Sequence, residues 1–157
     1  MKVFLCLFML FSFNAFAQES RFSGKDLPRF SALKSDKVNA RVGPNVKYPL
    51  KYIYVKKFLP VIVVNEYYGW YQIRDMNGDL SWVHRDNFTS KDYAMIKSNE
   101  VFLYKKAKLN SKVLAKINKG IIFLVDECEV KFCKVKTNYN GKKFEGYILK
   151  SELYGVN

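Results

Sequence analysis

LKSDKVNAR, at residues 33–41, decides the fold of this chain because the stretch recurs. IKSNEVFLY, at residues 96–104, aligns with it without a gap, 63 positions later. After a one-residue deletion Trp70 aligns with Phe132, and a later three-residue insertion carries the match to the end of the unit. Both length changes fall where turns are expected, so the pattern indicates a duplicated unit. Two units of about 60 residues each predict two small domains in tandem.

Each unit has the pattern of short strands separated by turns. The expected strands of the first unit cover residues 59–64, 70–74 and 80–84, and those of the second cover 121–125, 133–136 and 145–149. Asn77-Gly78 and Asn140-Gly141 predict hairpin turns, since both residue types tolerate a positive φ. Residues 18–157 contain no convincing helical periodicity with caps. The sequence therefore predicts an all-β fold of two small barrels or sandwiches.

The first 17 residues have the pattern of a secretory signal peptide. Lys2 supplies the positive end, and residues 3–11 form an apolar run that is too short to span a bilayer. Ala15-Phe16-Ala17 fits signal peptidase, so we expect cleavage after Ala17 and export to the periplasm or the medium, with no membrane span afterwards. A short hydrophobic anchor is the alternative.

The expected organisation follows from the signal peptide and the repeat. The signal peptide covers 1–17, a flexible lead-in covers 18–29, and the first and second domains cover 30–90 and 91–157.

Cleavage would remove Cys6 and leave Cys128 and Cys133. Two cysteines in an oxidising compartment indicate a disulfide, and this spacing suits two strand ends that face each other across a tight turn. Two reduced, packed cysteines are the alternative. Zinc is not expected, because two cysteines are too few ligands and His84 is the only histidine. The sequence predicts no metal site and no cofactor.

The charge is strongly positive, with 27 Lys and Arg against 14 Asp and Glu, a net +13. Scattered lysines favour attraction to anionic surfaces in general, whereas specific phosphate recognition favours arginine. A lysine-rich composition that serves only solubility is the alternative. One histidine, scattered carboxylates and no glycine-rich phosphate loop argue against an enzyme.

The motifs of the first unit resemble those of the bacterial SH3-like domain. They are VNARVGP at 38–44, YP at 48–49, GWYQI at 69–73 and WVH at 82–84. Ser81 departs from the family's usual glycine, and the second unit keeps only the hydrophobic skeleton. The tandem form looks like that of exported two-repeat proteins. The resemblance implies tandem SH3-like barrels, each partly opened and of five or six strands, which bind rather than catalyse. In exported bacterial proteins such domains often hold peptidoglycan or its peptides.

The candidate ligand-binding residues are polar and aromatic side chains at the loops and strand starts that flank the groove in such a barrel. They are Asn39, Arg41, Tyr48, Tyr67, Tyr68, Trp70 and Trp82. Flat rings suit sugar faces, acyl stems and prolines, and an arginine suits a carboxylate. Trp70 follows a glycine at a strand start, where a partly exposed ring can edge the groove. The alternative for Trp82, and for Tyr71, is plain core.

These observations predict a non-catalytic exported module that binds cell-wall peptidoglycan or a peptide through its first repeat. One alternative is a structural or adaptor protein whose partner is another envelope protein. A second is a basic module for anionic polymers, since aromatic rings alternating with lysines can bind single strands. Nucleic acid is not the expected partner of an exported protein.

Overall fold

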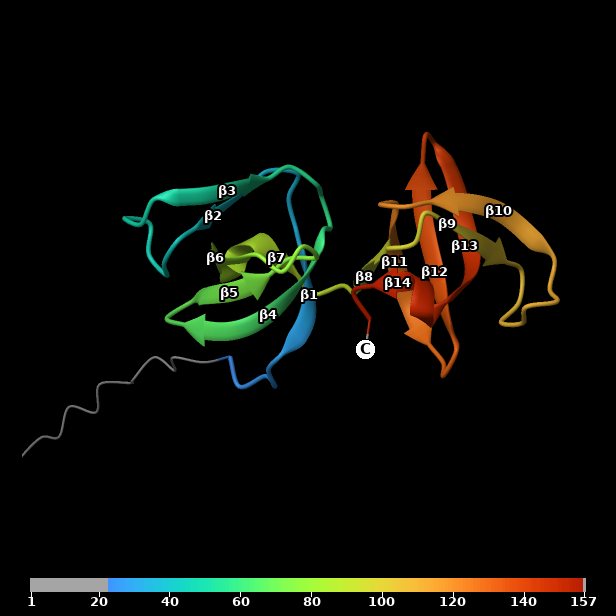
Figure 1. Cartoon of the computed structure of the whole chain (residues 1–157), viewed down its shortest axis with the longest axis horizontal. Helices are drawn as coiled ribbons and strands as arrows, with labels where there is room; N and C mark the ends of the chain where they lie inside the picture. Colours follow the sequence, from blue (N-terminus) through green and yellow to red (C-terminus); the bar gives the residue numbers. More distant parts are fainter. Residues whose placement is uncertain (1–22, 157) are drawn as a thin grey trace, which may run out of the picture.

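The computed structural model describes residues 23–156 and shows two curled β-sheets, one in each repeat (Figure 1). All the strand pairs are antiparallel. The all-β architecture predicted from the repeat is therefore confirmed. The predicted signal peptide, with Ala17, lies outside the described residues. Within the described part of the chain, no helix has the length and apolar character needed to cross a bilayer.

The first sheet contains seven strands in the order β3-β2-β6-β5-β4-β1-β7. The strands are β1 (Arg29–Leu33), β2 (Val38–Arg41), β3 (Leu50–Tyr54), β4 (Pro60–Tyr67), β5 (Trp70–Arg74), β6 (Leu80–His84) and β7 (Phe88–Thr89). A single 3₁₀ turn, η1 (Arg85–Asn87), joins β6 to β7.

The second sheet repeats this order as β10-β9-β13-β12-β11-β8-β14. Its strands are β8 (Tyr93–Ile96), β9 (Glu100–Tyr104), β10 (Val113–Asn118), β11 (Ile122–Cys128), β12 (Phe132–Tyr139), β13 (Lys142–Leu149) and β14 (Leu153–Tyr154), with η2 (Lys150–Glu152) before β14. Seven strands exceed the five or six that the resemblance implies, because β7 and β14 are two-residue strands that close each unit against β1 and β8.

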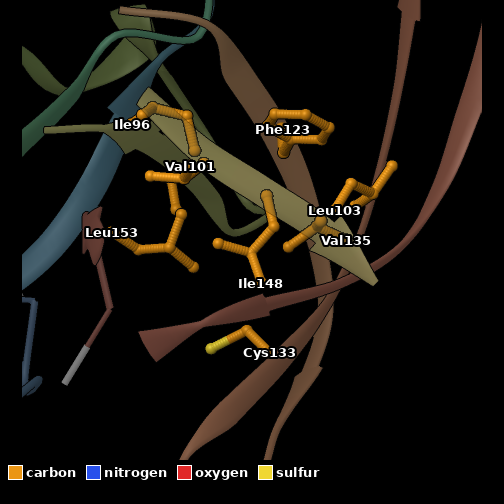
Figure 2. Packing of buried hydrophobic residues seen from close by; sticks show 9 residues of the cluster. Ile96, Val101, Leu103, Phe123, Cys133, Val135, Ile148 and Leu153 are labelled. Carbon is orange, nitrogen blue, oxygen red and sulfur yellow. The ribbon is translucent and has the colours of Figure 1, made fainter. Parts of the chain in front are cut away.

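Each sheet encloses its own core of side chains that alternate along the strands. The buried residues Leu33, Val38, Ala40, Ile73 and Val83 of the first core match Ile96, Val101, Leu103, Val135 and Ile148 of the second. Figure 2 shows the second set converging from β8, β9, β12 and β13, with Phe123 of β11 closing the cluster. The apolar positions of the sequence repeat are thus core positions in both copies.

Backbone hydrogen bonds carry the duplication into loops where the sequences differ. The Phe58 amide donates to the Leu33 carbonyl at 2.8 Å, and the Gly120 amide donates to the Ile96 carbonyl at 2.9 Å. Both donors have a left-handed backbone, with φ of 62° at Phe58 and 86° at Gly120. The same turn is therefore made by phenylalanine in one copy and by glycine in the other.

The second repeat retains more of the motif than its hydrophobic skeleton, which corrects the sequence analysis. Gly146 occupies the place of Ser81, since they pair with Val135 and Ile73 respectively. A Cβ on Gly146 would lie 2.6 Å from the Tyr104 carbonyl and 2.9 Å from Leu103 Cγ, so glycine is required there. Leu103 matches the smaller Ala40, and this difference in volume makes room for the buried Ser81 side chain in the first repeat.

The two Asn-Gly turns differ in form. Asn140 and Gly141 have φ of 50° and 76° and form the predicted two-residue hairpin turn between β12 and β13. Gly78 alone has a positive φ in the other loop, which spans residues 75–79. There the Asp75 carboxylate accepts hydrogen bonds from the Asn77 and Asp79 amides at 2.9 and 3.1 Å. A carboxylate thus organises the loop that the sequence assigned to Asn-Gly alone.

A disulfide joins Cys128 and Cys133, as predicted, and the two residues are direct cross-strand partners on β11 and β12. Cys133 is fully buried in the second core. The alternative of two reduced cysteines is therefore wrong for this structure.

Reduction of this disulfide is expected to lower the unfolding free energy of the second repeat by about 2 kcal/mol, because the bridge closes only a short loop in the unfolded chain. Urea denaturation with and without a reductant measures the difference. A variant with Cys128→Ala and Cys133→Ala is the control, and its unfolding should not respond to the reductant. Two reactive thiols in the untreated, denatured protein would contradict the bridge.

The first repeat has an ion pair near the matched position. Glu66 and Tyr71, which occupy the places of Cys128 and Cys133, are likewise direct cross-strand partners. The Glu66 carboxylate accepts a hydrogen bond from Arg29 at 2.6 Å, and the Arg29 guanidinium lies 5.1 Å from the centre of the Tyr71 ring. Glu66 also accepts bonds from the Ser23 amide and hydroxyl at 2.6 and 2.8 Å. Ser23 lies in the predicted flexible lead-in, so this part of the segment is bonded to the first sheet.

The two repeats meet through β1 and the turn before β4 on one side and through β8, β14 and Gly120 on the other. The rings of Phe58 and Tyr93 stack with centroids 4.1 Å apart and planes within 3°. Phe30 packs edge-on against Tyr154, with centroids 5.3 Å apart. The Lys56 ammonium donates to the Gly120 carbonyl at 2.6 Å. Three contacts of different kinds thus join the two units directly.

Candidate functional site

The loop at residues 42–49, between β2 and β3, is held by its own backbone and by Arg41. Arg41 Nη1 donates to the Tyr48 carbonyl at 2.7 Å, and the Tyr48 amide donates to the Asn45 carbonyl at 3.1 Å. The Tyr48 ring lies directly over Gly43, where a Cβ would come within 2.7 Å of the ring. Glycine at 43 therefore permits this ring position, and Arg41 fixes the carbonyl next to it.

This loop and the end of β4 surround a shallow hollow of about 410 Å³. Its lining residues are Pro44, Asn45, Lys47, Tyr48 and Tyr67. Both tyrosines are 46% exposed, so their rings are accessible from the solvent. The structure thus brings together two predicted site residues, Tyr48 and Tyr67, which are distant in the sequence.

Tyr67 and Tyr68 form an aromatic pair beside this hollow. Their ring centroids lie 4.7 Å apart at 83°, and Tyr68 is 48% exposed. Tyr68 and Gly69 have φ of 43° and 80°, which makes them the central residues of a tight turn that usually takes Asn-Gly. A tyrosine is strained in a left-handed conformation, and such strain is often retained where the side chain serves a function.

Trp70 does not edge the groove, which corrects the expectation of a partly exposed ring. Only 9% of it is exposed, and its ring packs edge-on against the His84 ring with centroids 5.3 Å apart. His84 in turn accepts a hydrogen bond at Nδ1 from the Asp86 amide, at 3.5 Å, and so caps η1. Both residues therefore have structural roles in the described fold.

Arg41, Trp82 and Asn39 lie on the outward face of the first sheet, because the burial of β2 and β6 alternates. Arg41 and Trp82 are direct cross-strand partners and are half-buried. Asn39 is exposed two residues earlier and does not line the hollow. Tyr71 is also half-buried, so neither Trp82 nor Tyr71 is fully enclosed core.

Sequence reasoning missed three lining residues, Pro44, Asn45 and Lys47. They lie within or between the Gly-Pro and Tyr-Pro motifs, and that position was the available signal. Asn45 accepts a hydrogen bond from the Lys47 amide at 2.9 Å, so its side chain shapes the loop. Lys47 adds a positive charge to the lining that contains the two tyrosines.

The matched loop of the second repeat has the same backbone without these side chains. The Lys108 amide donates to the Lys106 carbonyl at 2.7 Å and the Ser111 amide to the Lys108 carbonyl at 3.1 Å, as Asn45 and Tyr48 do in the first repeat. Lys106 stands in place of Gly43 and Ser111 in place of Tyr48. The loop conformation therefore does not require the Gly-Pro and Tyr-Pro motifs.

The cysteines and the histidine of the described residues have structural partners. Among residues 23–156, no group of three or more His, Cys, Asp or Glu side chains is placed to hold a metal ion. Both cysteines in that range are in the disulfide, and the Nδ1 atom of His84 serves the cap of η1.

Two small antiparallel sheets, each curled around its own core, define a class of small β-barrel domains, and the comparisons with known proteins identify the family. The bacterial SH3 domain family matches residues 34–88 and again residues 97–155. The chain belongs to this family and contains two tandem copies of the domain. No catalytic domain accompanies these two matches. No curated protein sequence matches the chain.

Two solved structures from Trichomonas vaginalis are similar to the chain. NlpC2 is 15% identical with a TM-score of 0.36, over 83% of this chain and 49% of that one. NlpC1 is 16% identical with a TM-score of 0.36, over 85% of this chain and 48% of that one. The chain spans about half the length of these proteins.

Proposed function

We propose that this protein is a non-catalytic exported module that binds cell-wall peptidoglycan, or a peptide of the envelope, through its first repeat. The observation that carries the proposal is the comparison of the two loops. The second repeat keeps the loop backbone but has no counterpart of the Tyr48 ring. Since folding does not require the motif, its retention around a solvent-accessible hollow supports a role in binding.

The chemistry of the hollow suits a ligand with flat apolar parts and a carboxylate. The rings of Tyr48, Tyr67 and Tyr68 offer contact area with little loss of conformational entropy. Within residues 23–156 the Lys47 side chain is in no ion pair, so its ammonium can serve as a partner for an anion. A peptidoglycan stem peptide on its sugar combines such groups, whereas a uniform polyanion would need only the charge.

Tyr48→Ser and Tyr68→Asn are expected to weaken binding to purified peptidoglycan by tenfold or more each, about 1.4 kcal/mol or more. Serine is the residue at the matched loop position of the second repeat, and asparagine suits the left-handed turn. The folded state should therefore be unchanged or more stable in both variants. Sedimentation with insoluble peptidoglycan, together with thermal melting, measures the two effects separately.

The control is Phe102→Ala, which removes an exposed ring of the second repeat and should leave the affinity unchanged. Equal losses in all three variants would contradict a specific site. If binding disappears at high salt and ignores both tyrosines, an anionic-polymer function replaces the proposal. Release of soluble fragments from the peptidoglycan by the pure protein would contradict the non-catalytic assignment.

The export that the proposal requires has its own test. The natural protein should begin at Gln18 in intact-mass measurement of the periplasmic or secreted fraction, since Ala15-Phe16-Ala17 fits signal peptidase. An intact Met1 in a cytosolic fraction would contradict export.

A further inference from the structure

A second and larger hollow, of about 860 Å³, lies where the turn before β4 meets the second sheet. The first repeat contributes Lys56, Lys57 and Phe58 to its lining, and β8 contributes Tyr93. The rest comes from β11–β13 and the turn before β11, namely residues 120–122, Leu124, residues 136–139 and residues 143–145. This hollow shares no residue with the hollow at Tyr48. The proposed function therefore leaves it unassigned.

Contacts between the two repeats form one part of the hollow. The Phe58 ring stacks on Tyr93 at 4.1 Å, and the Lys56 ammonium bonds to the Gly120 carbonyl. Ile122 and Leu124 point away from the second core, because the intervening Phe123 points into it. Apolar side chains of both repeats thus line the hollow.

Phe58 indicates that this wall serves more than the fold. The matched turn of the second repeat has Gly120, which adopts a left-handed backbone without strain. Phe58 adopts the same conformation with a side chain that disfavours it, and keeps the ring that completes the hollow. Glycine would form this turn without strain, so the turn itself does not explain the phenylalanine. The presence of its ring is therefore a reason to assign a ligand to this surface.

The rim carries an excess of positive charge. Lys136 is paired with Asp126 at 2.7 Å, and Glu145, which carries the one carboxylate in the lining, is paired with Lys134 at 3.5 Å. Within residues 23–156, neither Lys57 nor Lys143 is in an ion pair. Both residues line the hollow, one from each repeat, and the Lys57 ammonium lies 5.0 Å from the centre of the Phe58 ring.

We propose that this hollow binds an amphipathic anion, an alkyl or aryl body that carries a carboxylate, phosphate or sulfonate. The volume falls in the range of small-molecule sites, about 300–1,000 Å³. The apolar body lies on Phe58, Ile122 and Leu124, and the anion lies between Lys57 and Lys143. The site is independent of the peptidoglycan site in the first repeat.

Anilinonaphthalene sulfonate and decanoate are the probes, one aryl and one alkyl. The sulfonate should fluoresce on the native protein, decanoate should compete with it, and the uncharged decanol should compete at least tenfold less well. Phe58→Gly and Lys143→Glu should each lower the probe's affinity about tenfold, or 1.4 kcal/mol. The probe that binds with the lower Kd shows whether the site prefers an aryl or an alkyl group.

Tyr48→Ser is the matched control and should bind the probes as the wild type does. Phe58→Gly copies the second repeat's turn, and Lys143→Glu alters an exposed residue that does not pack in the core, so thermal melting should show both folded. In two-dimensional amide NMR, decanoate should shift residues 120–124 and 136–145 and leave 44–48 unchanged. Shifts confined to 44–48, equal competition by decanol, or unchanged affinity in both variants would overturn the proposal.

Discussion

Trp70→Ala is expected to lower the unfolding free energy of the first repeat by about 3–5 kcal/mol, the usual cost of removing a buried tryptophan or phenylalanine ring. The ring is 9% exposed and its loss also leaves the His84 ring without its contact. Phe132→Ala, at the matched position in the second repeat, should have a comparable effect, since Phe132 is 6% exposed. Chemical denaturation measures both.

Tyr67→Ala is the control for Trp70→Ala, because its ring is exposed and should cost little stability. A Trp70→Ala protein that melts like the wild type but no longer binds peptidoglycan would show that Trp70 edges the binding groove. That result would contradict the structure. The expected result is the reverse, so that Trp70 reports on folding and Tyr48 and Tyr68 report on binding.

Glu66→Gln should lower the unfolding free energy of the first repeat by about 3 kcal/mol, the lower end for removing one partner of a buried ion pair. Glu66 is 3% exposed, and its loss leaves the Arg29 guanidinium largely buried without its carboxylate. Arg29→Lys tests whether the planar shape of the guanidinium is needed, since lysine keeps the charge but cannot reproduce the guanidinium that lies over Tyr71. A Glu66→Gln protein as stable as the wild type would show that the pair contributes nothing.

The same group predicts an acid dependence. Burial raises the pKa of Glu66, but hydrogen bonds from Ser23 and Arg29 outweigh burial and lower the pKa overall. The folded state then favours the ionised form, so this stabilisation is complete above the unfolded pKa of about 4.3 and is lost as the pH falls through the lower folded value. The difference in stability between wild type and Glu66→Gln should therefore shrink below about pH 4.

The fold was predictable because the same pattern of core positions occurs in both repeats of the sequence. Positions such as Leu33 and Ile96, or Val83 and Ile148, keep an apolar residue in both copies, and alternation along the strands assigns them to one face. The short strands β7 and β14 were not predictable, since two residues show no periodicity. Gly146 was overlooked because its need arises from the Tyr104 carbonyl and the Leu103 side chain, which are remote in the sequence.

The site was predictable in part. The motifs located Tyr48, Tyr67 and Tyr68, whose exposure follows from loops and turns. Trp70 was placed wrongly, because exposure of a residue at a strand start depends on its cross-strand partner, here His84. The hollow between the repeats could not be predicted, because it requires the contact between Phe58 and Tyr93, and no local pattern specifies how two domains meet.

The two repeats are sensitive to different conditions, because the same cross-strand position is stabilised in a different way in each. In the first repeat the Arg29–Glu66 ion pair holds the β4–β5 hairpin to β1, and in the second the covalent bond between Cys128 and Cys133 closes the β11–β12 hairpin. Acid weakens the first and leaves the second intact, whereas a reducing agent does the opposite. The order in which the two halves unfold should therefore reverse with the kind of stress applied, and neither acid nor reductant removes both restraints at once.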